Sequence, residues 1–409
     1  MRTSVRVLAV ADSDSYLKWS VATLAALPVG WRGEQVLVAS PVAPSANQVR
    51  AAAGAVVPTL SLGRLLARIL RERPDVVLLA CTGPVVEVLA ALPVLSRARR
   101  RPVLVTGLPG VHDPPTVRAV RHRARCDVFL AHSHAEVEGV AALAEVHAPG
   151  LQVALARLPF LGGGDPATQD VQPARTEVVF AAQATVPGPR AEREAVLRGL
   201  AALHPPGTAV VKLRAGDGEA QTHHEPWPYP ALWRDLVARG EVEPGQVRFR
   251  AGSMAEALNR ARALVTVSST AALEAIGRGV PVAVLRDFGV SPAQLNQLFV
   301  GSGCLATLED VRAGRFPPAD PGWAERHYFH PRADDDWEPR LRSLLDRRAA
   351  GGLAARRIRP SGRAGSPWRR APWRRAPWRW VARLMLPRWA LRRAGALRAA
   401  ALRRSSAAA

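Results

Sequence analysis

The chain has 409 residues, and 48% of them are apolar, so it is long enough for two ordinary domains with buried cores. The net charge of +22 is concentrated at one end, because residues 351–409 contain 16 arginines and no acidic residue, which leaves about +6 for residues 1–350. The net charge therefore does not indicate nucleic-acid binding by residues 1–350. The three cysteines lie far apart in the sequence and form neither a zinc motif nor a disulfide framework, so we expect a reducing environment.

Residues 1–160 alternate short apolar segments with longer segments of helical periodicity. The apolar segments are continuous rather than alternating, which is typical of a parallel sheet covered by helices on both faces. This pattern predicts a Rossmann-like domain over residues 1–160. Its strands are predicted at 5–11, 35–40, 75–80, 102–107, 126–132 and 151–156.

Polar residues follow two of these predicted strands. The segment ADSDSYLKW at 11–19 places Asp12, Asp14 and Lys18 after the first strand, and GLPGVHDPP at 107–115 places His112 and Asp113 after another. Ligands of open α/β sheets bind beyond the carboxyl ends of the strands, so these side chains are candidates for acceptor binding and base catalysis. For the Asp residues, an Asx turn with an N-cap is the structural alternative.

Residues 161–174 are rich in Gly, Pro and polar residues, which indicates a linker between domains. A second α/β series follows and predicts a further Rossmann-like domain over residues 175–350, which ends in a helix at 337–349. The sequence therefore predicts two tandem, doubly wound α/β domains. The strands of the second domain are predicted at 177–183, 208–213, 246–251, 263–268 and 281–285.

The segment VTVSSTAALEAIGRGVPVAVL at 265–285 predicts a strand that ends near Ser268 and a helix that begins at Ser269–Thr270. A helix start flanked by hydroxyl groups can bind phosphate, although a plain N-cap uses the same residue types. Glu274 lies four residues after Thr270, and a capping box needs three, so capping from Thr270 does not explain it. Its carboxylate can bind ribose hydroxyls, or it can be simply solvated.

This segment resembles the nucleotide-sugar segment of GT-B glycosyltransferases, and it is especially similar to the Ser-Ser/Thr motif of bacterial capsule-type transferases and of sialyl- and polysialyltransferases that use CMP-sialic acid. Residues 1–345 also resemble an uncharacterised glycosyltransferase family of high-GC bacteria. The resemblance implies that the first domain binds the acceptor and the second binds the donor. It further implies that Ser268, Ser269 and Thr270 hold the donor phosphate and Glu274 holds the ribose.

Capsule-type enzymes carry a Lys-x-His-Pro element near the leaving phosphate. Here Lys212 and Arg214 are present, but the histidines come later, at His223 and His224, so the match is incomplete. We expect Lys212 and Arg214 to bind the phosphate and His223 to protonate it, although His223 can also be an ordinary surface residue. No Asp-x-Asp element or metal-ligand cluster stands out, so we expect no essential metal and no cofactor besides the nucleotide-sugar co-substrate.

The resemblance to sialyltransferases favours Asp14 as the base that deprotonates the acceptor, followed by Asp12, with His112 or Asp113 as the alternative. The sequence thus predicts a metal-independent, inverting glycosyltransferase that moves a sialic-acid-like sugar from CMP to a surface glycan or a lipid-linked acceptor. Two other functions remain open. One is a UDP-sugar 2-epimerase of the same fold, and the other is a non-catalytic, membrane-attached protein that binds glycans or nucleotides.

Residues 351–409 form an Arg- and Trp-rich tail that contains the repeat SPWRRAPWRRAPWRW. Its arginines can bind anionic lipid headgroups and its tryptophans the interfacial zone, although a solvated tail or nucleic-acid binding would fit the same composition. No secretory signal or long apolar segment is evident, so we expect a cytoplasmic protein that attaches peripherally to the inner face of the membrane.

Overall fold

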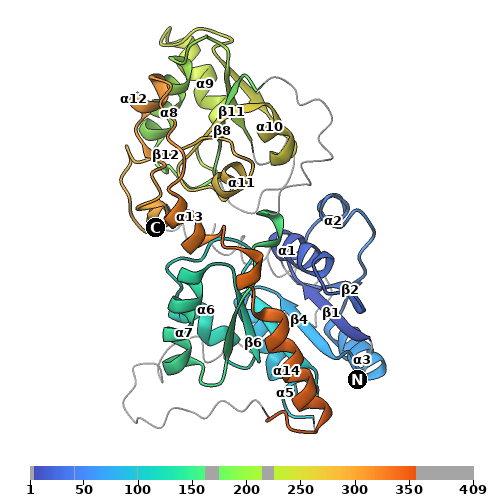
Figure 1. Cartoon of the computed structure of the whole chain (residues 1–409). Coiled ribbons are helices and arrows are strands. Elements are labelled where there is room, and N and C mark those ends of the chain that lie inside the picture. Colours follow the sequence, from blue (N-terminus) through green and yellow to red (C-terminus); the bar gives the residue numbers. More distant parts are fainter. Residues whose placement is uncertain (1–3, 41, 99, 162–174, 214–224, 356–409) are drawn as a thin grey trace, which may run out of the picture. The chain divides into compact units, whose positions relative to one another are not determined.

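The computed structural model describes residues 4–40, 42–98, 100–161, 175–213 and 225–355 (Figure 1). The chain divides into two compact units. Unit 1 comprises the residues up to Pro159 together with those from Arg332 onward, and unit 2 comprises Phe160–Pro331. Each unit is an α/β domain built on a parallel sheet, so the predicted fold class of two tandem doubly wound domains is confirmed.

Unit 1 contains a seven-stranded sheet with the strand order β3-β2-β1-β4-β5-β6-β7, and every neighbouring pair is parallel. Its central strands are apolar and almost fully buried, as expected for a sheet with helices on both faces. The strands are β1 (Val5–Ala11), β2 (Trp31–Val38), β3 (Thr59–Leu60), β4 (Val76–Ala80), β5 (Val103–Gly107), β6 (Val128–Ala131) and β7 (Gln152–Leu155).

Helices α1 to α7 lie in the connections between these strands, because parallel neighbours cannot be joined by a tight hairpin. Hydroxyl N-caps mark several helix starts; for example, Ser133 accepts a hydrogen bond from the backbone N–H of Glu136 at 3.0 Å. The helices are α1 (Asp14–Ala25), α2 (Ala46–Ala53), α3 (Leu62–Glu72), α4 (Gly83–Ala91), α5 (Pro93–Ser96), α6 (Val117–Arg123), α7 (His134–His147) and α14 (Trp337–Ala349).

Unit 2 contains a six-stranded parallel sheet with the order β10-β9-β8-β11-β12-β13. Its strands are β8 (Glu177–Ala181), β9 (Ala209–Lys212), β10 (Val247–Arg250), β11 (Ala261–Thr266), β12 (Val282–Leu285) and β13 (Leu305–Ala306). Its helices are α8 (Arg190–Ala201), α9 (Tyr229–Ala238), α10 (Met254–Arg260), α11 (Ala271–Gly277), α12 (Leu308–Arg312) and α13 (Pro321–His327). Sequence analysis missed only edge strands here and in unit 1, because β3 and β13 are two residues long and carry no periodicity.

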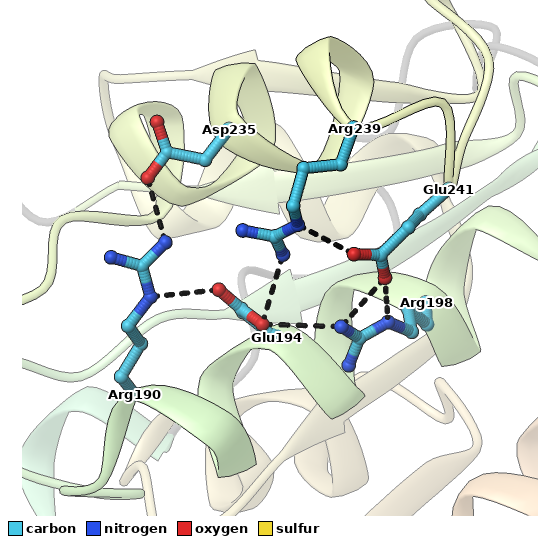
Figure 2. Close-up of polar contacts among 6 residues, drawn as sticks. All are labelled: Arg190, Glu194, Arg198, Asp235, Arg239 and Glu241. Atoms are coloured by element: carbon cyan, nitrogen blue, oxygen red, sulfur yellow. Dashed lines mark hydrogen bonds and ion pairs between the residues drawn. The ribbon is translucent and has the colours of Figure 1, made fainter.

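A network of ion pairs joins α8 to α9 on the surface of unit 2 (Figure 2). Glu194 is at its centre and accepts from three arginines, with N–O distances of 2.8 to 3.1 Å. Exposed pairs contribute little singly, but a shared carboxylate fixes the two helices relative to each other. The members of this α8–α9 network are Arg190, Glu194, Arg198, Asp235, Arg239 and Glu241.

The helix at 337–349 was expected to close the second domain, and this assignment is wrong. It is α14, which lies beside the sheet of unit 1 (Figure 1). It packs on β5 and β7. Asp336, at its start, accepts from the N–H of Leu155 at 2.7 Å, and Arg348, near its end, pairs with Asp75 at 2.8 Å. The amphipathic pattern of the helix shows that it packs on a core, but it does not show which core.

The predicted linker at 161–174, apart from Leu161, and almost all of the tail lie outside the described residues. The last described part of the tail follows α14 along unit 1, where the guanidinium of Arg101 donates to the Ala354 carbonyl at 2.9 and 3.2 Å. Within the described part of the chain, no helix has the length and apolar character needed to cross a membrane.

Candidate functional site

Unit 2 has a topological switch point between β8 and β11, because the chain leaves these neighbouring strands in opposite directions along the sheet. Gln183 follows β8 and Ser268 follows β11. The Gln183 side-chain carbonyl accepts from the N–H of Ser268 at 2.9 Å, and its amide donates to the Ser268 hydroxyl at 2.9 Å. The predicted Ser-Ser-Thr segment therefore begins at the position where open α/β sheets bind ligands.

The rest of this segment forms a turn that leads into α11. Ser269 donates its N–H to the Thr266 hydroxyl at 3.1 Å, and its own hydroxyl accepts from the N–H of Ala271 at 3.2 Å. Thr270 is exposed, and no described group hydrogen-bonds to its N–H or its hydroxyl. The turn thus presents hydrogen-bond donors of Ser269 and Thr270 and carries no carboxylate of its own.

The helix that follows is short but has the predicted boundaries. It spans Ala271–Gly277, and Gly279 adopts the left-handed conformation at φ 64°, which glycine tolerates best. Glu274 lies partly buried within it. The expected contact between Glu274 and a ribose stays a prediction.

Of the expected phosphate-binding cations, the structure describes one. Lys212 is the last residue of β9, next to β8 in the sheet, and it is buried. Its ammonium group donates to the Leu213 carbonyl at 2.5 Å. Arg214 and His223 lie outside the described residues.

Sequence analysis missed two residues that shape this site. Gln183 is the last residue of the strand predicted at 177–183, and that position was the available signal. Arg193 gave no such signal, because in so arginine-rich a sequence a buried arginine cannot be distinguished from the exposed ones. Its guanidinium, fully buried, donates to the carbonyls of Gln183 and Ala184 at 2.9 and 2.7 Å and to Glu225 at 2.6 Å, and so holds the loop after β8.

Unit 1 has the equivalent switch point between β1 and β4. Asp12 follows β1 and has 0% exposure. Its carboxylate accepts from the Thr82 N–H, at 3.0 Å from both oxygens, and from the Thr82 hydroxyl at 2.5 Å. Burial raises the pKa of Asp12, and the hydrogen bonds from Thr82 oppose that rise. Asp12 is enclosed and caps the start of α4, so in this conformation it cannot reach an acceptor.

Arg123 and Asp12 contact the two ends of a single peptide group. The guanidinium of Arg123, which is 1% exposed, donates to the Cys81 carbonyl at 3.3 Å, and the N–H of the same peptide, that of Thr82, donates to Asp12. Arg123 also donates to the Tyr16 hydroxyl at 2.7 Å, and burial raises the pKa of Tyr16 to about 12. We call this arrangement the Asp12–Arg123 bridge.

Asp14 is the first residue of α1. One of its carboxylate oxygens accepts from the Lys18 ammonium at 2.7 Å, across one helical turn. The other oxygen is buried and has no hydrogen-bond partner among the described residues. The structure therefore brings Asp14 and Lys18 together, as an ion pair.

His112 lies in the loop after β5. Its ring Nδ1 is 3.0 Å from the Gly110 carbonyl, and its backbone N–H donates to Glu136 at 3.0 Å. Burial lowers the pKa of His112 below its ordinary value of 6.5, and the nearby Glu136 charge opposes this effect. Asp113, the next residue, is partly buried.

Glu136 was also missed, although the pattern Ser133-x-x-Glu136 is a recognised helix-start signal. Ser133 caps the helix as the pattern predicts. The buried Glu136 carboxylate instead joins two loops, because it accepts from the N–H groups of His112 at 3.0 Å and of His132 at 2.8 Å. Within the described ranges, no group of three or more His, Cys, Asp or Glu side chains could hold a metal ion.

Comparisons with solved structures show likeness at the level of the fold. The S. aureus MnaA–UDP co-structure has 11% identity and a TM-score of 0.51, with 85% of this chain and 98% of that chain covered. A UDP-N-acetylglucosamine 2-epimerase has 13% identity and a TM-score of 0.51, with 85% and 97% covered. The glycotransferase of kitacinnamycin has 17% identity and a TM-score of 0.44, with 85% and 95% covered.

No curated protein matches the sequence. A family model does match, over residues 7–344, which include all but the first two residues of β1 in the two sheets, and both switch points. The chain belongs to the family described as "Putative glycosyltransferase (DUF6716)".

Proposed function

We propose that this protein is a metal-independent, inverting glycosyltransferase that takes its sugar from a nucleotide donor bound at the switch point of unit 2. Membership of the glycosyltransferase family supports the reaction class. The observation that carries the donor site is the turn at Ser268–Thr270, where the hydroxyls of Ser269 and Thr270 and the N–H of Thr270 can donate at a switch point without a carboxylate. Phosphate binds to such donors and is repelled by fixed negative charge.

In this proposal Ser268, Ser269 and Thr270 hold the donor phosphate and Glu274 holds the ribose. Lys212, together with Arg214, neutralises the departing phosphate in place of a metal, and His223 can protonate it. A base on unit 1 removes the proton of the acceptor hydroxyl. Two of the similar structures carry UDP or act on a UDP-sugar by name, which supports a nucleotide-sugar ligand of this fold. The resemblance of the Ser-Ser-Thr segment favours a CMP donor with a sialic-acid-like sugar.

The donor site is tested by a thermal-shift screen of the full-length protein with CMP, UDP, GDP and dTDP. A bound nucleotide at 100 times its Kd stabilises the folded protein by about 2.7 kcal/mol, which such a screen detects. The double variant Ser269→Ala/Thr270→Ala should lose the shift. The matched control is Ser253→Ala, which removes the N-cap of α10 in the same unit. If the double variant keeps the full shift, the nucleotide binds elsewhere.

The reaction is tested by incubating the protein with each nucleotide sugar, with and without cell-surface glycan or lipid-linked acceptors. A transferase releases nucleotide and forms a new glycoside. A 2-epimerase converts a UDP-N-acetylhexosamine to its epimer, or releases the free sugar, with no acceptor present. A binding protein changes neither. Either of the last two results would overturn the proposed activity.

The tail supports the proposal that the protein acts at the inner face of the cytoplasmic membrane, on a surface-glycan or lipid-linked acceptor. Tethering the enzyme there would raise the effective concentration of such an acceptor. Full-length protein should co-sediment with vesicles that contain anionic lipid and much less with neutral vesicles. Replacing Trp368, Trp373 and Trp378 with alanine should weaken the binding. Binding that ignores lipid charge contradicts this part of the proposal.

A further inference from the structure

We propose that His112 is the catalytic base of unit 1, that it accepts the acceptor's proton at Nε2, and that Glu136 is its positioning residue. This inference rests on the proposed transferase function. It replaces Asp14, the base that sequence analysis favoured. The argument depends on which nitrogen of His112 carries a proton and on what each alternative side chain contacts.

The hydrogen bonds of His112 fix its tautomer. A carbonyl oxygen can only accept, so the contact of 3.0 Å between Nδ1 and the Gly110 carbonyl places the proton on Nδ1. The neutral ring then carries its lone pair on Nε2. No described group donates to that nitrogen, and His112 is partly rather than fully buried, so Nε2 is left to accept a proton. An unprotonated, accessible nitrogen is what a base requires.

His132 differs from His112 in the contacts of its ring nitrogens. Its Nδ1 donates to the Ala156 carbonyl at 2.8 Å, and its Nε2 accepts from the indole N–H of Trp19 at 2.9 Å. Both ring nitrogens are therefore occupied, and the side chain is buried. His132 is a structural residue, although it is similarly placed at the carboxyl end of a strand.

Asp12 and Asp14 are less suited than His112 to act as the catalytic base. Asp12 is enclosed and already accepts hydrogen bonds from Thr82. Asp14 is held by Lys18, so a proton transfer to its carboxylate would weaken an ion pair. Its second oxygen has no partner but is buried, and it fits a hydrogen bond from a substrate better than a proton transfer. We assign Asp14 to acceptor binding.

The charges around His112 suit a base that starts neutral and ends as a cation. Burial, with smaller contributions from Arg123 and His132, lowers the pKa of His112 and keeps the ring neutral before reaction. Glu136, on α7, acts in the opposite direction and stabilises the imidazolium once it forms. Glu136 also fixes the backbone of His112, so one carboxylate sets both the position and the charge balance of the base.

The proposed step balances as follows. The acceptor O–H proton moves to Nε2 of His112, and the acceptor oxygen forms a bond to the anomeric carbon of the donor. The bond between that carbon and the phosphate oxygen breaks, and its electron pair leaves with the nucleotide. The products are a glycoside, a nucleotide and an imidazolium, which releases its proton to solvent.

The test uses the full-length protein and the nucleotide sugar that it cleaves, with nucleotide release measured as a function of pH. A histidine base loses activity about tenfold per pH unit below its pKa, so the acid limb should lie below pH 6.5, because burial lowers the pKa of His112 from its ordinary value. His112→Gln should lower kcat by about 10² to 10⁴ and remove this limb, while nucleotide still raises the melting temperature.

Glu136→Gln should lower kcat and also move the acid limb to lower pH, because the negative charge that raises the pKa of His112 is lost. A purely structural role for Glu136 would lower the melting temperature without moving the limb. The control His147→Gln, at the far end of α7, should change neither. An acid limb that persists in His112→Gln, or full kcat in that variant, would overturn the assignment. Absence of any nucleotide-sugar cleavage by the wild type would instead overturn the proposed function.

Discussion

The two units place different polar groups at the same topological position. At the switch point of unit 1, the Asp12 carboxylate accepts from Thr82, next to the start of α4. At the switch point of unit 2, the neutral Gln183 amide contacts Ser268, next to the start of α11. The first group is enclosed and linked to Arg123 through one peptide group, and the second is partly exposed with unused donors beside it.

This difference teaches that the fold alone does not decide which unit binds an anion. Both sheets offer a crevice at the carboxyl ends of their strands. In unit 1 the protein's own carboxylate already occupies the helix start, so a phosphate there would meet a like charge. In unit 2 the equivalent position lacks that charge. The polar residue that follows the first strand of each sheet, Asp12 in unit 1 and Gln183 in unit 2, therefore decides which unit can bind an anion.

The largest expected effect concerns the Asp12–Arg123 bridge. Asp12→Asn and Arg123→Met should each destabilise unit 1 by about 3 kcal/mol, because each leaves buried hydrogen-bonding groups without their charged partner. The double variant should cost clearly less than the sum, since neither charge remains. Urea unfolding of the two single variants and the double variant measures this coupling. Additive costs would mean that the shared peptide does not couple the two side chains.

The second prediction concerns a substitution that places a carboxylate at the switch point of unit 2, as Asp12 does in unit 1. Gln183→Glu keeps the side-chain shape and an acceptor for the Ser268 N–H but adds a negative charge beside the proposed phosphate site. We expect nucleotide affinity to fall by about 10- to 100-fold, or about 1.4–2.7 kcal/mol. Titration calorimetry measures the effect. Gln246→Glu, which adds the same charge in a surface turn of unit 2, is the control and should bind normally.

A matched pair of hydroxyl deletions should give smaller effects. Thr82→Val leaves the buried Asp12 short of a hydrogen bond and should cost about 1–3 kcal/mol of folding free energy. Ser268→Ala removes a contact to the partly exposed Gln183, where water can replace it, and should cost less than about 1 kcal/mol. Thermal unfolding compares the two variants. Equal costs would contradict the difference in burial between the switch points.

The sequence predicted the strands that carry both switch points, because continuous apolar segments bounded by polar residues mark buried parallel strands. It also placed Ser268–Thr270 and Asp12 at strand ends. It did not predict that Asp12 is enclosed, because this depends on Thr82, which lies 70 residues away in the chain. Glu136 was missed for the same reason, since its partners come from loops that only the fold brings together.

The smallest effect is a difference in pH dependence between the units. In unit 2, hydrogen bonds from Arg250 lower the pKa of Glu177, and those from Arg239 and Arg198 lower the pKa of Glu241 in the α8–α9 network (Figure 2). Their stabilising effect is therefore complete above the unfolded pKa of about 4.5 and is lost as the pH falls below it.

The contribution of Asp12 in unit 1 to stability changes with pH in the opposite direction. Its folded pKa is raised above 3.8, so the folded state binds the proton more tightly, and its contribution to stability decreases as the pH rises through that range. Acidification from pH 7 to pH 4 should therefore weaken unit 2 more than unit 1. Limited proteolysis at both pH values, with cleavage sites assigned by mass spectrometry, should show earlier cutting in unit 2. Earlier cutting in unit 1 would mean that the carboxylates of the two units do not differ in this way.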